Sequence, residues 1–295
     1  MTQRLRVGLV GGGPWARDVH APALAAHPEF ELAGVWTRRP GVAAALAEQH
    51  GAAPFDDVDA LIDAVEVIAC CVPPDVQASI AGRAARAGRH LILEKPLAGS
   101  LAEAEALVAD VAAAGVASIM VLVLRYSPET RQWLTTIRAG SGWHGGNARW
   151  ISGKLLDHNA PPTPWRHSAG AIADIGPHAF DLLDAALGPI VDVAGASHAG
   201  SDVWHVILRH DGGASSAVTL SLKTPVDPSV VEFDVYGGAG RCVLDPRRTP
   251  PRDCYATMLD ELAAMARSGT TDHPCDVRRG MYLQWVIERV GDLVR

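Results

Sequence analysis

A run of glycines stands directly behind a short apolar segment near the start of the chain. The apolar segment is Leu5–Val10, and the next six residues, Gly11–Ala16, read G-G-G-P-W-A. Glycine adopts backbone conformations that other residues avoid, and proline is favoured in the first turn of a helix. The pattern therefore predicts a strand, a tight turn and a helix, which is the opening unit of a parallel α/β sheet.

The alternation of short apolar runs with alanine-rich stretches continues to about Gly115. Further strands are predicted over Glu31–Trp36, Val65–Cys71, His90–Glu94 and Ala117–Leu124, and helices over Trp15–His27, Gly41–Gln49, Val76–Ala87 and Leu101–Ala114. Strands that alternate with helices form parallel sheets covered on both faces. We therefore predict a doubly wound α/β domain of the Rossmann type over residues 1–120.

The sequence changes character beyond Arg125. A helix is predicted over Pro128–Ala139, and runs of alternating polarity follow at Val203–Arg209, Ala217–Lys223 and Val230–Tyr236. Such alternation is typical of an antiparallel sheet with one buried face. We predict a second, α+β domain over residues 121–295, built on a large, mainly antiparallel sheet. Two helices, interrupted near residues 268–274, are expected to close the chain.

Composition excludes several classes of protein. Of the 295 residues, 48% are apolar and 20% charged, and no apolar run reaches the length of a membrane span, so a soluble protein with no membrane partner is expected. The net charge of −7 and scattered arginines argue against a nucleic-acid partner. The five cysteines have no disulfide or metal-binding spacing, and we read no export signal at the start. We expect reduced thiols and a cytoplasmic protein.

The glycine turn matches a dinucleotide-binding fingerprint. Gly11, Gly13 and Ala16 fit the pattern G-x-G-x-x-A, in the required context of a strand before and a helix after. Gly11 allows the tight turn, Gly13 lets a pyrophosphate approach the backbone, and the helix start at Pro14 and Trp15 offers free N–H groups. We interpret the turn as a dinucleotide site; a purely structural glycine turn is the alternative.

The end of the second predicted strand indicates which dinucleotide is bound. An NAD-preferring domain usually places an acid there to bind the adenosine ribose. This chain has Thr37, followed by Arg38 and Arg39. Arginine binds phosphate through charge-assisted hydrogen bonds, so we favour NADP over NAD. The alternative is that both arginines are ordinary solvated side chains at a turn.

Two further segments carry residues suited to catalysis. Lys95, in Glu94-Lys95-Pro96, stands at the end of a predicted parallel strand, where open α/β sheets bind ligands. A lysine there can polarise a substrate oxygen beside a nicotinamide, although an exposed loop lysine is the alternative.

The second segment holds Asp174 and His178, which are four residues apart. If a helix begins at Gly176, they can share one face of its first turn. An imidazole can accept the proton that a substrate hydroxyl loses when hydride leaves its carbon. Asp174 could orient the imidazole or hold a neighbouring hydroxyl. A buried structural histidine is the alternative.

Taken together, the fingerprint, Glu94-Lys95-Pro96 and the Asp174–His178 segment resemble the Gfo/Idh/MocA family of oxidoreductases, named after glucose–fructose oxidoreductase, inositol dehydrogenase and a rhizopine catabolism protein. The resemblance extends over nearly the whole chain, to the closing segment Cys275–Val290. It implies that Lys95, Asp174 and His178 are the catalytic lysine, aspartate and histidine. It also implies homodimers or homotetramers formed through the second-domain sheet.

Other residues are candidates for contacts with ligands. Arg125, in Arg-Tyr-Ser-Pro, matches a family motif and Arg166 precedes the Asp174 segment, so both are predicted to bind substrate, with a structural ion pair as the alternative for Arg166. Pro73, Glu94 and His20 are predicted to line the cofactor crevice, with plain turn and capping roles as the alternative for Pro73 and His20. Val121–Leu124 is more apolar than in many family members, which weakens any transfer of substrate specificity.

A catalytic metal is not predicted. Asp174, His178, His158 and His167 are suitable ligand types, but their spacing matches no metal motif.

We therefore predict reversible hydride transfer between NADP(H), or NAD(H), and a hydroxyl or carbonyl carbon of a sugar, polyol or related polar metabolite. Two alternatives stay open. A glycosidase or lyase of the same fold would retain NAD and use it transiently, and a non-catalytic regulator would only sense the dinucleotide.

Overall fold

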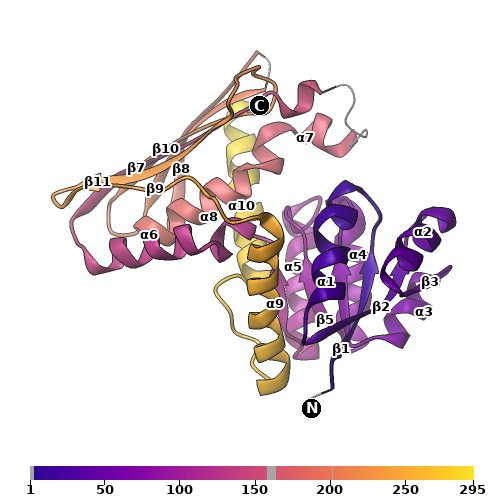
Figure 1. Cartoon of the computed structure of the whole chain (residues 1–295). Helices are drawn as coiled ribbons and strands as arrows, with labels where there is room; N and C mark the ends of the chain where they lie inside the picture. Colours follow the sequence, from indigo (N-terminus) through magenta and orange to yellow (C-terminus); the bar gives the residue numbers. More distant parts are fainter. Residues whose placement is uncertain (1–2, 158–163, 201) are drawn as a thin grey trace. The chain divides into compact units, whose positions relative to one another are not determined.

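The computed structural model describes residues 3–157, 164–200 and 202–295. The chain forms two compact units. The first comprises Met1–Tyr126 together with Pro250–Tyr282, and the second comprises Ser127–Thr249 together with Leu283–Arg295 (Figure 1). The return of Pro250–Tyr282 to the first unit is not anticipated by a division of the sequence at residue 120.

The first unit is built on a parallel sheet of six strands in the order β3-β2-β1-β4-β5-β6. This is the Rossmann order, in which the direction of winding reverses between β1 and β4. The strands are β1 (Leu5–Val10), β2 (Phe30–Trp36), β3 (Ala53–Phe55), β4 (Val67–Cys70), β5 (His90–Leu93) and β6 (Ser118–Met120).

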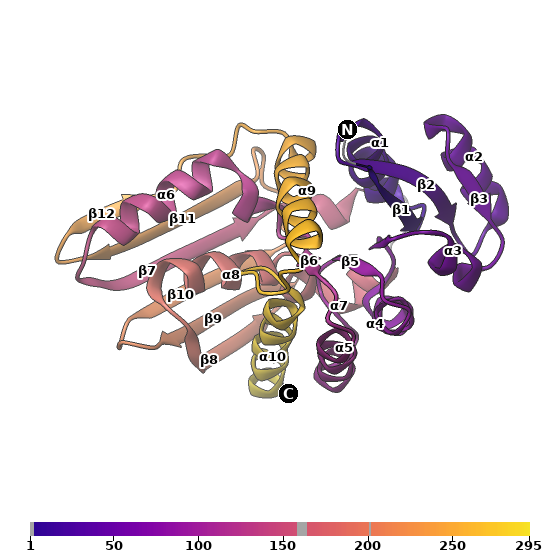
Figure 2. The same ribbon diagram turned by 90° about the horizontal axis from the view of Figure 1, so that it is seen from below.

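Helices cover both faces of this sheet (Figure 2). They are the π-helix η1 (Ala16–His20), α1 (Ala21–Ala26), α2 (Pro40–His50), α3 (Val58–Ala64), α4 (Pro74–Arg86) and α5 (Leu101–Ala114). A short 3₁₀ helix, η2 (Val123–Tyr126), follows β6. The parallel sheet with its crossover helices confirms the predicted α/β class.

Helix α9 (Pro251–Ser268) completes the first unit from the far end of the sequence. It contacts α1, η1, η2 and β6. Its inner face buries Tyr255, Met258, Leu259 and Leu262 completely. Each such apolar side chain contributes about 1.5–3 kcal/mol when it leaves water. The Rossmann unit therefore has part of its core in a segment that follows the second unit in the chain.

The second unit contains a six-stranded sheet in the order β12-β11-β7-β10-β9-β8. Its strands are β7 (Trp143–Ile151), β8 (Ile190–Ala199), β9 (Val203–His210), β10 (Ser215–Ser221), β11 (Val230–Gly237) and β12 (Gly240–Val243). Among the described strands of this second sheet, only β7 and β10 pair in parallel, and the other pairs are antiparallel. The mainly antiparallel second sheet is thus confirmed.

Strand register divides this second sheet into two distinct faces. Val206, Val218, Ala148 and Phe233 stand opposite one another on the buried face, which α8 (Gly176–Leu187) covers. The helices α6 (Pro128–Ala139) and α7 (Pro164–Asp174) and the end of α10 (Val277–Val294) also belong to this unit. The adjacent register positions, Ile207, Ala217, Asn147 and Asp234, stand on the opposite face.

The structure corrects some boundaries from the sequence. The strand predicted over Ala117–Leu124 ends at Met120, because the N–H of Leu122 turns back to the Met120 carbonyl and η2 begins at Val123. Strands β3, β7, β8 and β12 were not predicted. Strands β3 and β12 span only 3 and 4 residues, too few for a clear period. In β7 and β8, glycines at 145, 146 and 195 and irregular pairing in β8 interrupt the polar–apolar alternation from which strands are predicted.

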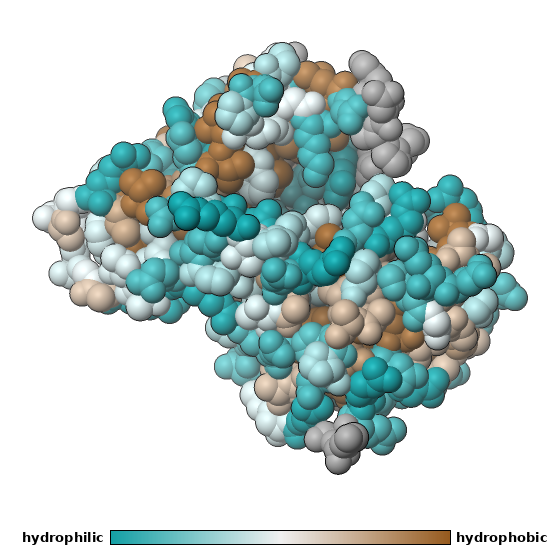
Figure 3. All heavy atoms as spheres, viewed as in Figure 1, coloured by the Kyte–Doolittle hydropathy of each residue, from teal (hydrophilic) through white to brown (hydrophobic). Residues whose placement is uncertain are grey.

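Among the described residues, no helix combines the length and apolar character needed to cross a bilayer. On the face drawn in Figure 3, hydrophilic residues predominate and hydrophobic ones occur in small groups.

Candidate functional site

The glycine turn after β1 is shaped by one close backbone contact. Gly11 has φ of +126°, and a Cβ at this position would lie 2.2 Å from the carbonyl oxygen of Cys71. Only glycine fits there without displacing the end of β4. A Cβ on Gly13, in contrast, would meet no atom within 4 Å. The turn is therefore packed on one side and open at Gly13, where the predicted pyrophosphate needs space.

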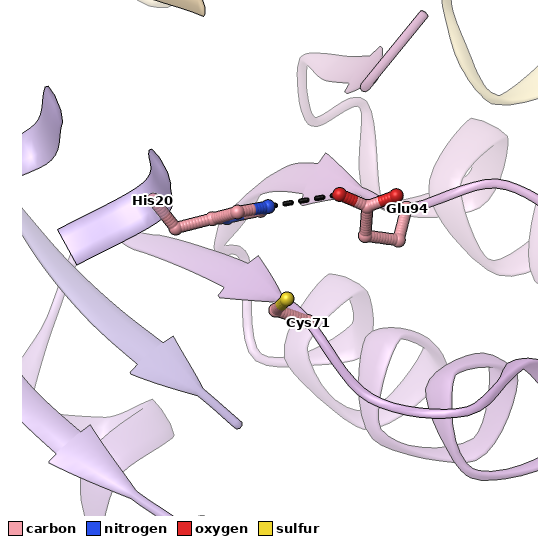
Figure 4. Close-up of side chains that lie close together, drawn as sticks. All are labelled: His20, Cys71 and Glu94. Atoms are coloured by element: carbon pink, nitrogen blue, oxygen red, sulfur yellow. Dashed lines mark hydrogen bonds and ion pairs between the residues drawn. The ribbon is translucent and has the colours of Figure 1, made fainter. Parts of the chain in front are cut away.

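The helix after the turn contains a π-helical segment, η1, just behind its first two residues. The wider turn Ala16–His20 places the His20 side chain in the interior, where it is fully buried. Its Nε2 lies 2.9 Å from Oε1 of Glu94, and its Nδ1 lies 2.9 Å from the hydroxyl of Tyr255. Figure 4 shows the imidazole pointing at the Glu94 carboxylate, with Cys71 near the pair. Single π turns of this kind often occur at functional sites.

Lys95 lies two residues beyond the end of β5, after Glu94, and is half-buried. Its own backbone N–H donates to Oε2 of Glu94 at 3.2 Å, and the Lys95–Pro96 peptide is cis. The buried carboxamide of Gln77 accepts the N–H of Glu94 at 2.8 Å and donates to the Glu94 carbonyl at 2.7 Å. The backbone that carries Lys95 is thus held by two side chains that the sequence did not single out for this role, Gln77 and Glu94.

The residues predicted to bind the adenosine phosphate follow β2. The Thr37 hydroxyl donates to the Arg39 carbonyl at 2.7 Å and accepts the Arg39 N–H at 3.1 Å. This hydrogen-bonded turn holds the backbone on both sides of Arg38, whose side chain is exposed. An exposed guanidinium at this point is available to an anionic group.

The predicted cofactor residues gather at one edge of the sheet. They follow β1 (Gly11, Gly13, Pro14, Trp15), β2 (Thr37, Arg38), β4 (Pro73) and β5 (Glu94, Lys95). These four strands are neighbours in the order β2-β1-β4-β5, and all are parallel, so their carboxyl ends lie together. This is the edge at which open α/β sheets bind ligands, at the point where the strand order reverses.

The ligand atoms of His20, Cys71 and Glu94 lie within 4.8 Å of one another and form a possible metal-binding group. However, His20 Nε2 and Glu94 Oε1 are already joined by a hydrogen bond, and Tyr255 bonds the other ring nitrogen. These hydrogen bonds explain why the ligand atoms of His20 and Glu94 lie close together. Of the residues considered from sequence as ligands, His158 lies outside the described residues.

The second unit holds Asp174 and His178 on successive helices. Helix α8 begins at Gly176 as predicted, but Asp174 is the last residue of α7, and Ile175 forms the turn between them. Asp174 is buried and its Oδ1 lies 3.3 Å from Nε of Arg166. Arg166 thus forms an ion pair with the predicted catalytic aspartate.

The His178 ring is also buried and stacks on Trp150 of β7, with ring centres 5.9 Å apart. Trp150 was not anticipated as a neighbour, because β7 itself was not predicted. The ring is thereby held between α8 and the sheet, which fixes the plane in which its nitrogens lie.

Asp202 is a further buried residue that the sequence did not reveal. Its carboxylate accepts the Ala171 N–H at 3.0 Å and the indole N–H of Trp204 at 2.9 Å. Gly170, which has φ of +68°, packs directly against this carboxylate, and a Cβ on Gly170 would lie only 2.3 Å from the Asp202 Oδ1 atom. Asp202 thus anchors the last turn of α7, which ends in Asp174. Arg125, the remaining predicted substrate residue, lies half-buried in η2 of the first unit.

Comparison with known families agrees with this architecture. Residues 5–122 match the model described as "Oxidoreductase family, NAD-binding Rossmann fold", and residues 130–243 match the "GFO/IDH/MocA C-terminal domain". A dTDP-3,4-didehydro-2,6-dideoxy-alpha-D-glucose 3-reductase of Streptomyces violaceoruber is 31% identical over 271 residues, which cover 84% of this chain and 74% of the relative. The chain belongs to the Gfo/Idh/MocA family.

Solved structures with this fold hold different dinucleotides. GenD2 from gentamicin A biosynthesis, in complex with NAD, is 22% identical with a TM-score of 0.87, covering 99% of this chain and 94% of that one. The 3-ketoreductase KijD10 of Actinomadura kijaniata, in complex with NADP, is also 22% identical with a TM-score of 0.82, covering 99% and 98%. At these identities the likeness establishes the fold of this family member.

The two outer glycines of the turn should respond differently to a methyl group. Gly13→Ala should leave the melting temperature nearly unchanged, because the added Cβ meets no protein atom, but should weaken dinucleotide binding at least about tenfold. Gly11→Ala should destabilise the fold itself by about 1–3 kcal/mol, since its Cβ and φ are both disallowed.

Thermal melts without ligand and a fluorescence titration with NADPH would separate the two effects. Equal binding by Gly13→Ala and the unmodified protein would contradict a pyrophosphate site at this turn.

Proposed function

We propose that this protein catalyses reversible hydride transfer between a nicotinamide dinucleotide and a hydroxyl or carbonyl carbon of a polar metabolite. The observation that carries the proposal is the sheet edge in the first unit. There, an open glycine turn at a helix N-terminus follows β1, and the half-buried Lys95 lies just beyond the end of β5, with the parallel strand β4 between the two. A sugar or polyol is the substrate class that we favour, as the family resemblance implies.

The residues at this edge fit a dinucleotide. The backbone at Gly13, Pro14 and Trp15 would hold the pyrophosphate, because the space at Gly13 is open and helix N–H groups bind anions. Thr37 and Arg38 would hold the adenosine end, and Pro73, Glu94 and Lys95 the nicotinamide end. When bound, the cofactor supplies or accepts the hydride, while the protein supplies alignment and charge.

The chain's own residues supply the proton chemistry. Lys95 Nζ donates a hydrogen bond to the substrate oxygen and stabilises negative charge there. The His178 imidazole accepts the hydroxyl proton during oxidation and returns it during reduction. The ion pair with Arg166 holds the Asp174 carboxylate in place. This carboxylate orients the substrate or the imidazole. Arg125 and Arg166 are proposed as further substrate contacts.

We propose that the two domains predicted from the sequence have different functions. Dinucleotide binding is proposed to reside before about residue 120, and substrate binding and self-association in residues 121–295. The five cysteines are all free. Since free thiols are usual in reducing compartments, we propose a cytoplasmic location, which fractionation of the producing cells would test.

Replacement of the proposed acid–base groups should stop most turnover without releasing the cofactor. Lys95→Met and His178→Ala are expected to lower kcat by about 10²–10⁴-fold, the usual contribution of a positioned acid or base. NADP(H) affinity should change little. Reduced-nicotinamide absorbance in a screen of sugars and polyols would supply the assay.

The same screen distinguishes the alternatives. A glycosidase or lyase would cleave its substrate without net turnover of free cofactor, and a regulator would show no turnover at all. A loss below about tenfold in His178→Ala would contradict its assignment as the base.

The cofactor preference should depend on Arg38. We expect the protein to bind NADP(H) more tightly than NAD(H). Arg38→Ala should weaken NADP(H) about ten- to hundredfold, because a hydrogen bond to a charged group contributes about 1.5–3 kcal/mol. Affinity for NAD(H) should barely change. Arg247→Ala, which removes an exposed arginine of the second unit, is the charge-matched control. Tighter binding of NAD(H) by the unmodified protein would overturn the preference.

The uncovered face of the second sheet is proposed as the contact between copies of the chain. Ile207, Tyr236 and Val243 share this face and are 46%, 43% and 48% exposed. Ile207→Glu should shift a dimer or tetramer toward smaller species in sedimentation velocity, because burying an unpaired charge is costly. Leu293→Glu, at an exposed site on α10, should not. A protein that sediments as a monomer at all concentrations would disprove the proposal.

A further inference from the structure

A chain of three buried polar side chains runs through the first unit to the backbone of Lys95. The Tyr255 hydroxyl meets Nδ1 of His20 at 2.9 Å, and Nε2 of His20 meets Oε1 of Glu94 at 2.9 Å. Oε2 of Glu94 then accepts the N–H of Lys95 at 3.2 Å. Tyr255 lies on α9, 235 residues from His20 in sequence, and both side chains are completely buried. The pair His20–Glu94 is drawn in Figure 4.

Burial of the Tyr255 hydroxyl, together with nearby charges, sets the direction of these hydrogen bonds. Burial raises the pKa of Tyr255 well above its usual range, and the nearby Glu94, Cys71 and Cys70 raise it further. The phenol therefore keeps its proton and can donate it to Nδ1 of His20. The imidazole N–H is then on Nε2, and it donates a hydrogen bond to Oε1 of Glu94. In this arrangement each hydrogen bond from Tyr255 through His20 to Glu94 has one donor and one acceptor.

Gln77 holds the same backbone segment from the other side. Its carboxamide nitrogen donates to the carbonyls of Glu94, Pro96 and Leu97 at 2.7, 3.3 and 3.0 Å, and its oxygen accepts the Glu94 N–H. The residues before and after Lys95 are thus fixed by Gln77, while the Lys95 N–H itself is fixed by Glu94. The long side chain of lysine is flexible, so the reach of its ammonium depends on how firmly its backbone is placed.

We propose that Tyr255 is a positioning residue for Lys95, acting through His20 and Glu94. The proposal rests on the proposed role of Lys95 in hydride transfer. Packing alone gives no reason for three polar groups in this core, because buried polar atoms are costly unless each is hydrogen-bonded. Their arrangement instead ends at the backbone N–H of the residue that polarises the substrate oxygen. Helix α9, which follows the second unit in the chain, thereby takes part in the chemistry of the N-terminal Rossmann sheet.

Tyr255→Phe tests the proposal, since it removes one oxygen and keeps the ring. We expect kcat to fall about ten- to hundredfold, the scale on which a small misplacement of a reacting group lowers rate. NADPH affinity, measured by fluorescence, should change less than about threefold. Tyr282→Phe, which removes a hydroxyl from α10 in the same unit, is the control and should keep full kcat. His20→Gln, which can still donate to Glu94 but cannot bond Tyr255 in the same way, should resemble Tyr255→Phe.

A double-mutant cycle with Lys95→Met separates positioning from general destabilisation. If Tyr255 acts through Lys95, adding Tyr255→Phe to Lys95→Met should lower kcat no further. An equal fold-loss in both backgrounds would overturn the proposal and leave Tyr255 a structural residue. Unchanged kcat in a folded Tyr255→Phe would also overturn it. Unchanged turnover in Lys95→Met alone would instead contradict the proposed function, so the two failures are distinguishable.

Discussion

The approach of the Gly11 backbone to the carbonyl oxygen of Cys71 is the contact on which the rest of the first unit depends. It brings the end of β1 against the end of β4, with no room for any side chain between them. The helix that follows can then start immediately, with Gly13 facing open space. Because all strands of this sheet are parallel, their carboxyl ends lie at one edge, and Thr37, Pro73 and Lys95 lie there with them. The steric constraint at Gly11 and the parallel pairing of the strands thus place the candidate ligand-binding groups at one edge of the sheet.

The cost of burying polar groups explains the next layer of the architecture. His20 enters the core on a π turn and would be costly there without partners. Glu94 supplies one from the end of β5, and Tyr255 supplies the other from α9. The helix α9 therefore contributes more than apolar area: it satisfies a polar atom that the Rossmann segment leaves in its own interior. This hydrogen bond and the buried apolar face of α9 together hold two distant stretches of chain in one compact unit.

In the second unit, strand register decides which side chains lie on each face of the sheet. The alternation along β9 and β10 sends Val206 and Val218 to the covered face, and Ile207 and Ala217 to the open one. The covered face also receives His178, stacked on Trp150, while the turn before Asp174 is held by Asp202. The two proposed functions of this unit, acid–base chemistry and self-association, are thereby assigned to opposite faces of one sheet.

The sequence by itself determined the class of both sheets, the glycine turn, the strand end at Lys95 and the helix start at Gly176. These are local properties, because a turn, a cap or a polar–apolar period is written in a few neighbouring residues. Helix α9 was expected as a helix, but its partner was not, since apolar periodicity specifies a buried face without naming what covers it. Strands β7 and β8 were missed because glycines and irregular pairing obscure their period. Gln77, Tyr255 and Asp202 gain their importance only from contacts made across 17, 235 and 31 residues. Such contacts are decided by tertiary structure, because a buried donor or acceptor needs a partner in space, and sequence distance carries no information about which residue that will be.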